Sequence, residues 1–297
     1  MPEHDPIDRV AYPFHDRWCD LSVGRMHYVD EGRGDPILFV HGTPTWSFEW
    51  RHLIRALAPA HRCIAPDLIG FGLSDRPAGF TYTPEAHGRV LAEFVDRIEL
   101  GPMTLVVHDF GGPIALPIAL RDPRRVPQLV LINTWMWSFV GDREMEQNGR
   151  FGGSALGRWL YRWANFSLRV LMPYAYGDKR KLTPAIHRQY LDRFPDRASR
   201  GTVLWPLARA LLGSSAYYDT LWRERERLRG VRALIIWGLR DRAFPPRLLE
   251  KWRTVLSDAE IVQLDDAGHW PHEEQPDRVV AAIERFLAAS PSPSAQA

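Results

Sequence analysis

Short apolar runs of strand length alternate with segments of helical length through most of this chain. The expected strands are 37–40, 63–66, 104–107, 129–132, 233–237 and 261–264, and the expected helices are 48–57, 84–98, 113–121 and 277–288. Strands that alternate with helices favour βαβ crossovers, which give a mostly parallel sheet with helices on both faces. The pattern therefore predicts an α/β fold. Residues 26–30 alternate apolar and polar side chains and are predicted as an antiparallel edge strand.

The strand pattern is interrupted between residues 137 and 213. Apolar residues recur there at helical spacing, namely Trp159, Leu160, Trp163, Phe166, Val170 and Leu171. This spacing predicts a helical insertion whose aromatic residues pack mostly in helix core and, as a set, line a substrate cavity. We therefore expect a core of residues 1–136 and 214–289, a helical cap of 137–213, and a disordered tail at 290–297.

The composition restricts the partners of such a fold. Of the 297 residues, 45% are hydrophobic and 25% are charged, which is typical of a globular protein. The net charge of +2 offers no electrostatic footprint for nucleic acid or an anionic membrane surface. Cys19 and Cys63 belong to no CxxC or Cys/His cluster, so neither a disulfide framework nor a zinc site is expected. Without a signal-like start or a run of about 18 apolar residues, we expect a cytoplasmic protein that spans no membrane.

The strongest chemical signal is the segment His108-Asp109-Phe110-Gly111-Gly112, which follows an expected strand and leads into an expected helix. It is similar to a nucleophile elbow, G-x-S-x-G, in which a strained strand-to-helix turn lifts the nucleophile above the sheet. Asp109 stands where the elbow has its serine. An aspartate before a helix can also act as a simple N-cap, so this segment by itself leaves both interpretations open.

Two later loops favour the catalytic interpretation. Asp241 follows the expected strand 233–237, and His269 follows the expected strand 261–264. The order nucleophile, acid, histidine is that of the α/β-hydrolases, so we interpret Asp109, Asp241 and His269 as a catalytic triad. The backbone N–H groups of Thr43 and Phe110 are expected to form its oxyanion hole.

Several polar residues beside these loops receive no catalytic role. His41 is expected to be structural rather than a base. The remaining charged neighbours are expected to lie at the surface, and they are Arg240, Arg242, His272, Glu273 and Glu274.

A carboxylate nucleophile narrows the reaction class. It attacks carbon by displacement and forms an ester through its own oxygen, which favours an alkyl halide or an epoxide as substrate. His269, oriented by Asp241, would then deprotonate a water that adds to the Asp109 carboxyl carbon. The developing charge would fall on the N–H groups of Thr43 and Phe110. This chemistry requires no metal and no organic cofactor.

These motifs resemble the haloalkane dehalogenase family of the α/β-hydrolase superfamily. The resemblance covers most of the chain and includes the segments 12–14, 28–32, 41–48 and 70–75 as well as the elbow and His269. It implies an α/β-hydrolase fold with a helical cap, Asp109 as nucleophile and His269 as base. It also implies an acid after one of two strands, and Asp241 is that acid because the segment 132–135 has no carboxylate.

The sequence departs from that family at the halide site. Family members hold the halide with a Trp after the nucleophile and an Asn or Glu after His-Gly, where this chain has Phe110 and Thr43. A benzyl ring has no N–H to donate, and a threonine hydroxyl is a single donor. Indoles that are candidates for the missing donor belong to Trp135, Trp137, Trp205 and Trp270.

The leading hypothesis is hydrolysis of a small apolar haloalkane to an alcohol and halide. The first alternative is an epoxide hydrolase or another hydrolase with an Asp nucleophile, in which tyrosine hydroxyls stabilise the leaving group. The candidate tyrosines are Tyr161, Tyr174, Tyr176, Tyr190, Tyr217 and Tyr218. The second alternative is a ligand-binding member without turnover, which an intact triad argues against.

Overall fold

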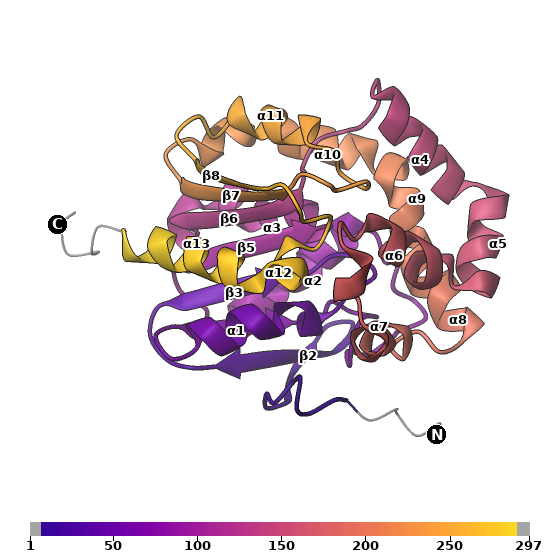
Figure 1. Cartoon of the computed structure of the whole chain (residues 1–297), viewed down its shortest axis with the longest axis horizontal. Coiled ribbons are helices and arrows are strands. Elements are labelled where there is room, and N and C mark those ends of the chain that lie inside the picture. The colour runs from indigo at the N-terminus through magenta and orange to yellow at the C-terminus, as the bar shows by residue number, and fades with distance from the viewer. Residues whose placement is uncertain (1–6, 290–297) are drawn as a thin grey trace.

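The computed structural model describes residues 7–289 and contains an eight-stranded sheet between two layers of helices (Figure 1). The sheet order is β1-β2-β4-β3-β5-β6-β7-β8, and pairing is parallel from β4 to β8. The predicted α/β fold with a mostly parallel sheet is therefore confirmed. The strands are β1 (Arg17–Leu21), β2 (Gly24–Glu31), β3 (Pro36–Val40), β4 (Arg62–Pro66), β5 (Thr104–Asp109), β6 (Gln128–Thr134), β7 (Arg232–Gly238) and β8 (Glu260–Leu264).

The antiparallel edge of the sheet differs from the prediction. Strand β2 is antiparallel to β4, as the alternation at 26–30 indicates, but it is not the edge, because β1 pairs along its other side. Sequence reasoning missed β1 because the strand is largely exposed and contains no apolar run. The edge prediction for residues 26–30 is therefore wrong.

The centre of the sheet determines where the functional loops lie. All six residues of β5 are buried, as expected for a parallel strand covered on both faces. Strand β5 lies between β3 and β6, with Val40 beside Val107 and Val107 beside Leu131. Since parallel strands end at the same edge, the loops that follow β3, β5, β6, β7 and β8 converge there.

Helices cover both faces of this sheet close to the positions predicted. In Figure 1, α1 (Arg51–Leu57) and α13 (Pro276–Ala288) lie on one face, and α2 (Pro84–Arg97) and α3 (Gly111–Arg121) lie on the other. The expected helix at 48–57 begins instead with a 3₁₀ turn at Ser47–Trp50. The shorter helices α11 (Arg247–Arg253) and α12 (Pro271–Glu274) flank β8 in the chain.

All of the described chain between β6 and β7 is helical or irregular, and most of its helices lie at one end of the sheet (Figure 1). Helix α4 packs closely against α9, and Tyr217 of α10 donates to the carbonyl of Pro113 in the core at 2.8 Å. The helices are α4 (Arg143–Gly153), α5 (Ala155–Ala164), α6 (Met172–Ala175), α7 (Pro184–Leu191), α8 (Arg197–Ser199), α9 (Trp205–Gly213) and α10 (Ser215–Arg223). The tail predicted at 290–297 lies outside the described residues.

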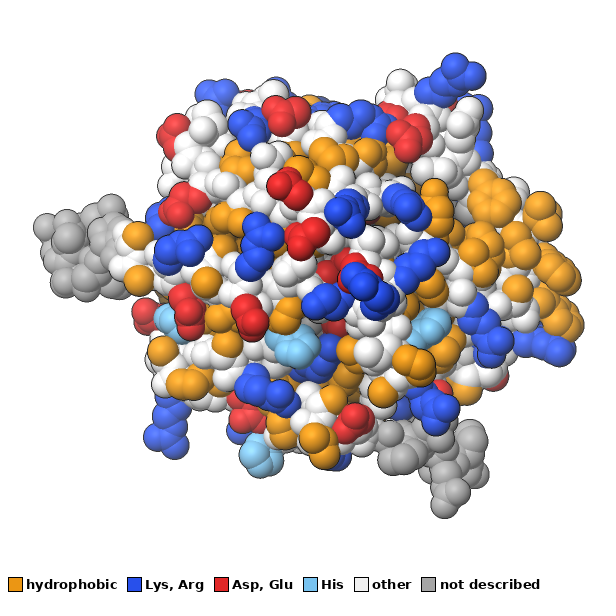
Figure 2. All heavy atoms as spheres, viewed as in Figure 1, with side chains coloured by type: hydrophobic (Ala, Val, Ile, Leu, Met, Phe, Trp, Pro, Cys, Tyr) orange, Lys and Arg blue, Asp and Glu red, His pale blue; other side chains and the backbone are white. Residues whose placement is uncertain are grey.

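Several apolar residues of the insertion are exposed, contrary to expectation. Trp159 and Trp163 on α5 are 55% and 46% exposed, and Val170 is 46% exposed. Figure 2 shows hydrophobic side chains gathered at this end of the molecule. Helical spacing identified an apolar face correctly but not what covers it, because period alone does not say whether that face meets the core or solvent. For Trp159 and Trp163 the expected place in the helix core is wrong.

The charged residues that follow His269 are also placed differently from the prediction. Arg240 and Arg242 are exposed as expected, whereas His272, Glu273 and Glu274 are buried. Glu274 accepts the backbone N–H groups of Gly268 and Asp178, each at 2.8 Å. The surface prediction for these three residues is wrong because tertiary packing buries them, and for Glu273 and Glu274 it also supplies polar partners that compensate the burial.

Glu273 forms a buried ion pair that joins three segments distant in sequence. Its carboxylate pairs with both terminal nitrogens of Arg51 on α1, one of them at 2.9 Å, and accepts the hydroxyl of Tyr190 on α7 at 2.5 Å. Arg51 is 3% exposed. The contact therefore fixes the insertion and α12 to the helical layer of the core.

None of the helices formed by residues 7–289 has both the length and the apolarity needed to cross a bilayer.

We expect Glu273→Ala to lower the free energy of unfolding by about 3–5 kcal/mol, because it leaves the Arg51 guanidinium buried without a counter-charge. Urea unfolding followed by tryptophan fluorescence measures this change. Glu284→Ala, at an exposed site on α13, is the matched control and is expected to stay within about 0.5 kcal/mol of the parent. A loss for Glu273→Ala as small as that of the control contradicts the prediction.

Candidate active site

Asp109 occupies a strained turn between β5 and α3. Its φ is +51°, a left-handed value that costs an ordinary residue about 1–3 kcal/mol. The turn is possible because its neighbours are glycines. A Cβ added at Gly111 would overlap the carbonyl of Val40, and one added at Gly42 would overlap the Asp109 carboxylate. The helix cap itself is Phe110 rather than Asp109, so the N-cap alternative does not describe this residue.

The two oxygens of Asp109 have different surroundings. Oδ1 accepts the backbone N–H of Phe110 at 2.5 Å and that of Thr43 at 3.2 Å. Oδ2 lies 3.3 Å from Nε2 of His269. The two N–H groups expected to form an oxyanion hole thus converge on one carboxylate oxygen and leave the other facing the histidine.

His269 lies between two carboxylates. Its Nδ1 is 2.7 Å from Oδ2 of Asp241, and its backbone N–H donates to the carbonyl of Ala175 at 2.9 Å, which anchors the loop to α6. Asp109, Asp241 and His269 are each at most 4% exposed. The structure therefore brings the three residues of the predicted triad into one hydrogen-bonded chain.

The charges around His269 control its protonation. Burial by itself lowers the pKa of His269, but the carboxylates of Asp241 and Asp109 outweigh that effect and raise it to about 10. The imidazole therefore carries a proton on both ring nitrogens while both carboxylates are ionised. Neutralising either carboxylate therefore lowers the pKa of His269, and the imidazole then releases one of these protons more readily.

Asn133 is a functional residue that sequence reasoning missed. It lies near the end of β6 with a φ of +35°, and its Nδ2 donates to Oδ2 of Asp241 at 2.7 Å. Oδ1 of Asp241 accepts the N–H groups of Ala243 at 2.7 Å and Phe244 at 2.9 Å. Sequence reasoning considered the segment 132–135 only for a carboxylate. An amide at a strand end that faces an acid after the next strand was the available signal.

His41 has the structural role expected for it. Its Nε2 accepts the N–H of Leu68 at 2.9 Å, and its Nδ1 lies 2.7 Å from the carbonyl of Gly42. Both ring nitrogens thus hold the loop that carries Thr43.

A cavity of about 310 Å³ opens above Asp109. Its floor includes Thr43, Asp109, Phe110 and His269, and its walls come largely from the helical insertion. The insertion contributes Met145, Asn148, Phe151, Tyr161, Leu171, Met172, Tyr174, Ala208 and Leu211, and later loops contribute Phe244 and Trp270. Of the apolar residues that recur at helical spacing in the insertion, only Leu171 lines this cavity, and the aromatic residues that the insertion contributes are Phe151, Tyr161 and Tyr174 instead.

The four tryptophans considered as halide donors occupy different environments. Trp205 donates its indole N–H to the carbonyl of Gly152, and Trp137 packs among other aromatic rings away from the cavity lining. Trp135 lies edge-to-face behind Phe110, with ring centroids 4.8 Å apart. Trp270 lines the cavity, and its indole N–H has no hydrogen-bond partner. The indole N–H of Trp135 also has no partner, but Trp135 does not line the cavity, so of the four Trp270 is the donor available beside Asp109.

The tyrosines offer little support for the epoxide alternative. Among the six candidates, only Tyr161 and Tyr174 line the cavity, and Tyr174 is 52% exposed. The hydroxyls of Tyr190, Tyr217 and Tyr218 bond to Glu273 and to backbone carbonyls instead. Burial, opposed by the hydroxyl of Ser167 and reinforced by the charge of Asp109, raises the pKa of Tyr161. One buried tyrosine, rather than a pair, is therefore close enough to sense the Asp109 charge from the cavity wall.

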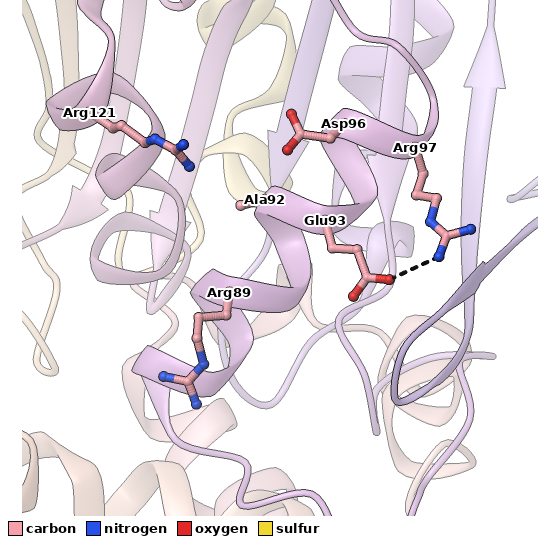
Figure 3. Close-up of a pocket in the computed structure, with 6 residues that line it drawn as sticks. All are labelled: Arg89, Ala92, Glu93, Asp96, Arg97 and Arg121. Atoms are coloured by element: carbon pink, nitrogen blue, oxygen red, sulfur yellow. Dashed lines mark hydrogen bonds and ion pairs between the residues drawn. The ribbon is translucent and has the colours of Figure 1, made fainter.

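A second depression lies on α2 and α3, and its lining includes none of these residues (Figure 3). Charged side chains surround it, but the carboxylates already have partners. Glu93 accepts from Ser22 and from Arg97 at 3.5 Å, and Asp96 pairs with Arg125 at 2.8 Å. It presents no group arranged for chemistry.

Comparisons with known proteins agree with this geometry. Residues 35–276 match the family model described as alpha/beta hydrolase fold. The chain is 39% identical over 282 residues to haloalkane dehalogenase 2 of Mycobacterium tuberculosis (strain H37Rv), covering 94% of this chain and 97% of that protein. It is 32% identical over 298 residues to a cis-3-alkyl-4-alkyloxetan-2-one decarboxylase of Xanthomonas campestris, covering 95% of this chain and 98% of that protein. The crystal structure of haloalkane dehalogenase DatA from Agrobacterium tumefaciens C58 has a TM-score of 0.80 and 26% identity, covering 94% of this chain and 98% of that one.

The sheet, the strained turn at Asp109 and the match to the family model define an enzyme of the α/β-hydrolase class. Within that class the chain belongs to the haloalkane dehalogenase family, and it is a hydrolase of the dehalogenase type. The family resemblance inferred from the sequence is confirmed.

We expect Asn133→Ala to lower kcat about tenfold, since the Asp241 carboxylate loses one charge-assisted hydrogen bond worth about 1.4 kcal/mol. Steady-state product release measures this change, with far-UV circular dichroism to verify folding. Gln128→Ala, at the other end of β6, is the control and is expected to keep the parent rate. An Asn133→Ala enzyme as active as the control would show that the backbone N–H groups alone hold Asp241.

Proposed function

We propose that this enzyme hydrolyses small apolar haloalkanes through an ester on Asp109. The observation that carries the proposal is that the two carboxylate oxygens of Asp109 have different partners. Oδ1 is held by the N–H groups of Phe110 and Thr43, while Oδ2 is directed toward His269 beneath an apolar cavity. A carboxylate in this arrangement attacks an sp³ carbon with Oδ2, and the carbon–halogen bond breaks as the ester forms.

The charge change in that first step prepares the second. Alkylation converts Asp109 into a neutral ester and removes one of the two carboxylates that hold the proton on His269. The imidazolium then loses its extra proton to solvent more readily, and the neutral ring accepts a proton from the attacking water, while Asp241 keeps the ring oriented. The resulting hydroxide adds to the Asp109 carboxyl carbon, and the negative charge develops on Oδ1, where Phe110 and Thr43 already donate. The bond from that carbon to Oδ2 then breaks, so that the alkyl group leaves as an alcohol with the proton from His269 and the Asp109 carboxylate is restored.

Residues 137–213 are assigned here the role of a cap over the site. Their side chains supply most of the cavity wall, and Ala175 within them anchors the loop of His269. A cavity of about 310 Å³ with mainly apolar walls suits a short-chain substrate. Trp270, with its unpaired indole N–H, is the proposed partner of the departing halide in place of the side chain at 110.

We expect His269→Ala to accumulate one alkyl group on Asp109 after exposure to 1-bromobutane, because the ester forms but no base activates water. Mass spectrometry of the peptide that contains Asp109 measures the adduct. The double variant Asp109→Asn/His269→Ala is the control and is expected to remain unmodified. No adduct on the single variant, or an adduct that persists in the double variant, contradicts the proposed nucleophile.

A second candidate function is cleavage of a β-lactone, and two observations favour it. Relatives that match nearly the whole chain are named for decarboxylation of 3-alkyl-4-alkyloxetan-2-ones. In addition, the cavity floor has Phe110 and Thr43 where a halide clamp would need side-chain N–H donors. Attack of Asp109 Oδ2 on ring carbon 4 would break its bond to the ring oxygen and free a carboxylate that stays attached to the substrate. Loss of CO₂ would then pass its electron pair into a C=C bond and expel Asp109, without a separate halide site.

We expect Phe110→Trp combined with Thr43→Asn to raise bromide release from 1-bromobutane by more than about tenfold, because each well-placed donor is worth ~2.7–4 kcal/mol to developing charge. Alkene formation from a cis-3,4-dialkyloxetan-2-one is not expected to rise. Ion chromatography and gas chromatography measure the two products in the parent and the variant.

The parent enzyme decides between the two candidates in the same assays. Bromide release without alkene supports the haloalkane assignment, and alkene without bromide replaces it with the lactone assignment. Unchanged bromide release in the Phe110→Trp/Thr43→Asn variant would show that another group, such as Trp270, already binds the leaving ion.

A further inference from the structure

Three chemistry-bearing side chains meet in the interior behind the active site, outside the cavity. They are Glu49 from the 3₁₀ turn before α1, His108 from β5 and His272 from α12. One ligand atom from each lies within 4.8 Å of the other two. All three residues are fully buried at 0% exposure. The mechanism proposed above uses none of them.

Several buried polar atoms of this cluster have no hydrogen-bond partner. Neither ring nitrogen of His272 has a hydrogen-bond partner, and Oε2 of Glu49 has none. A buried polar group without a partner costs about 1–3 kcal/mol, and more if it is charged. Three such atoms in one cluster indicate a missing partner.

The tautomer of His108 sharpens this point. Its Nε2 lies 2.8 Å from the backbone carbonyl of His269, which can only accept, so Nε2 carries the proton. In the neutral ring, Nδ1 then presents a lone pair. That lone pair faces Oε1 of Glu49 at 3.3 Å, and Nε2 of His272 lies 3.8 Å from the same oxygen. Two acceptors at such a distance require a positive charge between them.

A proton and a metal ion are the two species that can supply this charge. A second proton on His108 would satisfy its contact with Glu49, but it would leave His272 and Oε2 of Glu49 unpaired. A metal ion would use a nitrogen of each histidine and both carboxylate oxygens. A ligating histidine characteristically donates its other N–H to a carbonyl, as His108 does to His269.

We propose that Glu49, His108 and His272 bind one divalent transition-metal ion of the zinc class. Two imidazoles and a carboxylate are ligands that Zn²⁺, Co²⁺ and Ni²⁺ accept, whereas Mg²⁺ and Ca²⁺ prefer oxygen alone. The separations of 3.3 and 3.8 Å from Glu49 Oε1 are near the value of about 3.3 Å between tetrahedral ligands at zinc bond lengths.

The surroundings are compatible with a structural ion. Trp50 stacks on the His272 ring with centroids 4.6 Å apart and shields it from water. The nearby cation Arg51 is already neutralised by Glu273. The ion would tie the 3₁₀ turn, β5 and α12 together, and through His108 it would steady the backbone of His269. Glu49, His108 and His272 are therefore positioning residues.

The test is metal content measured on the intact chain. Purified enzyme dialysed against a weak chelator is expected to retain about one zinc-class ion per chain by inductively coupled plasma mass spectrometry. Glu49→Gln and His272→Gln are each expected to reduce that content at least about tenfold. His52→Gln on α1, outside the cluster, is the matched control and is expected to retain the ion.

A spectroscopic measurement keeps the proposal falsifiable if a variant fails to fold. Parent enzyme produced with Co²⁺ is expected to show visible d–d absorption typical of a nitrogen and oxygen ligand field, and folded His272→Gln is expected to lack it. The proposal is overturned if the purified parent enzyme contains no metal and the parent produced with Co²⁺ shows no d–d absorption. The cluster would then hold a shared proton. Metal content that neither variant reduces also overturns it, since the ion would then lie elsewhere.

Discussion

The architecture of this enzyme depends on one turn, in which Asp109 leaves β5 with a left-handed φ of +51° and α3 begins immediately afterwards. That turn places one carboxylate oxygen against the N–H groups of Phe110 and Thr43 and directs the other toward His269. The strained φ persists because close packing and hydrogen bonds around the turn hold the backbone in this conformation. Gly42 and Gly111 allow close backbone approach, and the hydroxyl of Thr134 donates to the carbonyl of Asp109 at 2.6 Å. The parallel sheet holds β3, β5 and β6 in register, so these contacts meet at one edge.

Electrostatics connects this turn to the proposed chemistry. A buried histidine between two carboxylates holds a proton that burial alone would remove, so the pKa of His269 is raised. Neutralising one carboxylate by alkylation reverses that balance, and the same imidazole becomes a base. Asn133 and two backbone N–H groups hold the Asp241 carboxylate in place through this change. The insertion adds an apolar wall, and Tyr190 links it to the buried pair of Arg51 and Glu273 in the core.

The central fold was predictable because strands buried on both faces are encoded as continuous apolar runs, as in β5 and β7. The proximity of Asp109, Asp241 and His269 followed from the rule that parallel strands end at one edge, so residues just after them converge. Strand β1 was not predictable in this way, because an exposed edge carries no such run. The exposure of Trp159 was likewise hidden, since helical period identifies an apolar face but not its partner.

The sequence by itself determined the parallel part of the sheet, the order of nucleophile, acid and histidine, and the family. It also revealed the replacement of the usual halide donors by Phe110 and Thr43. Only the tertiary structure decided which tryptophan borders the cavity, that Asn133 supports Asp241, and that His272, Glu273 and Glu274 are buried. It alone brought Glu49, His108 and His272 together. Local pattern records the period of an element and its apolar face, whereas contacts between residues separated by 59 or more positions arise only when the sheet and its covering helices pack.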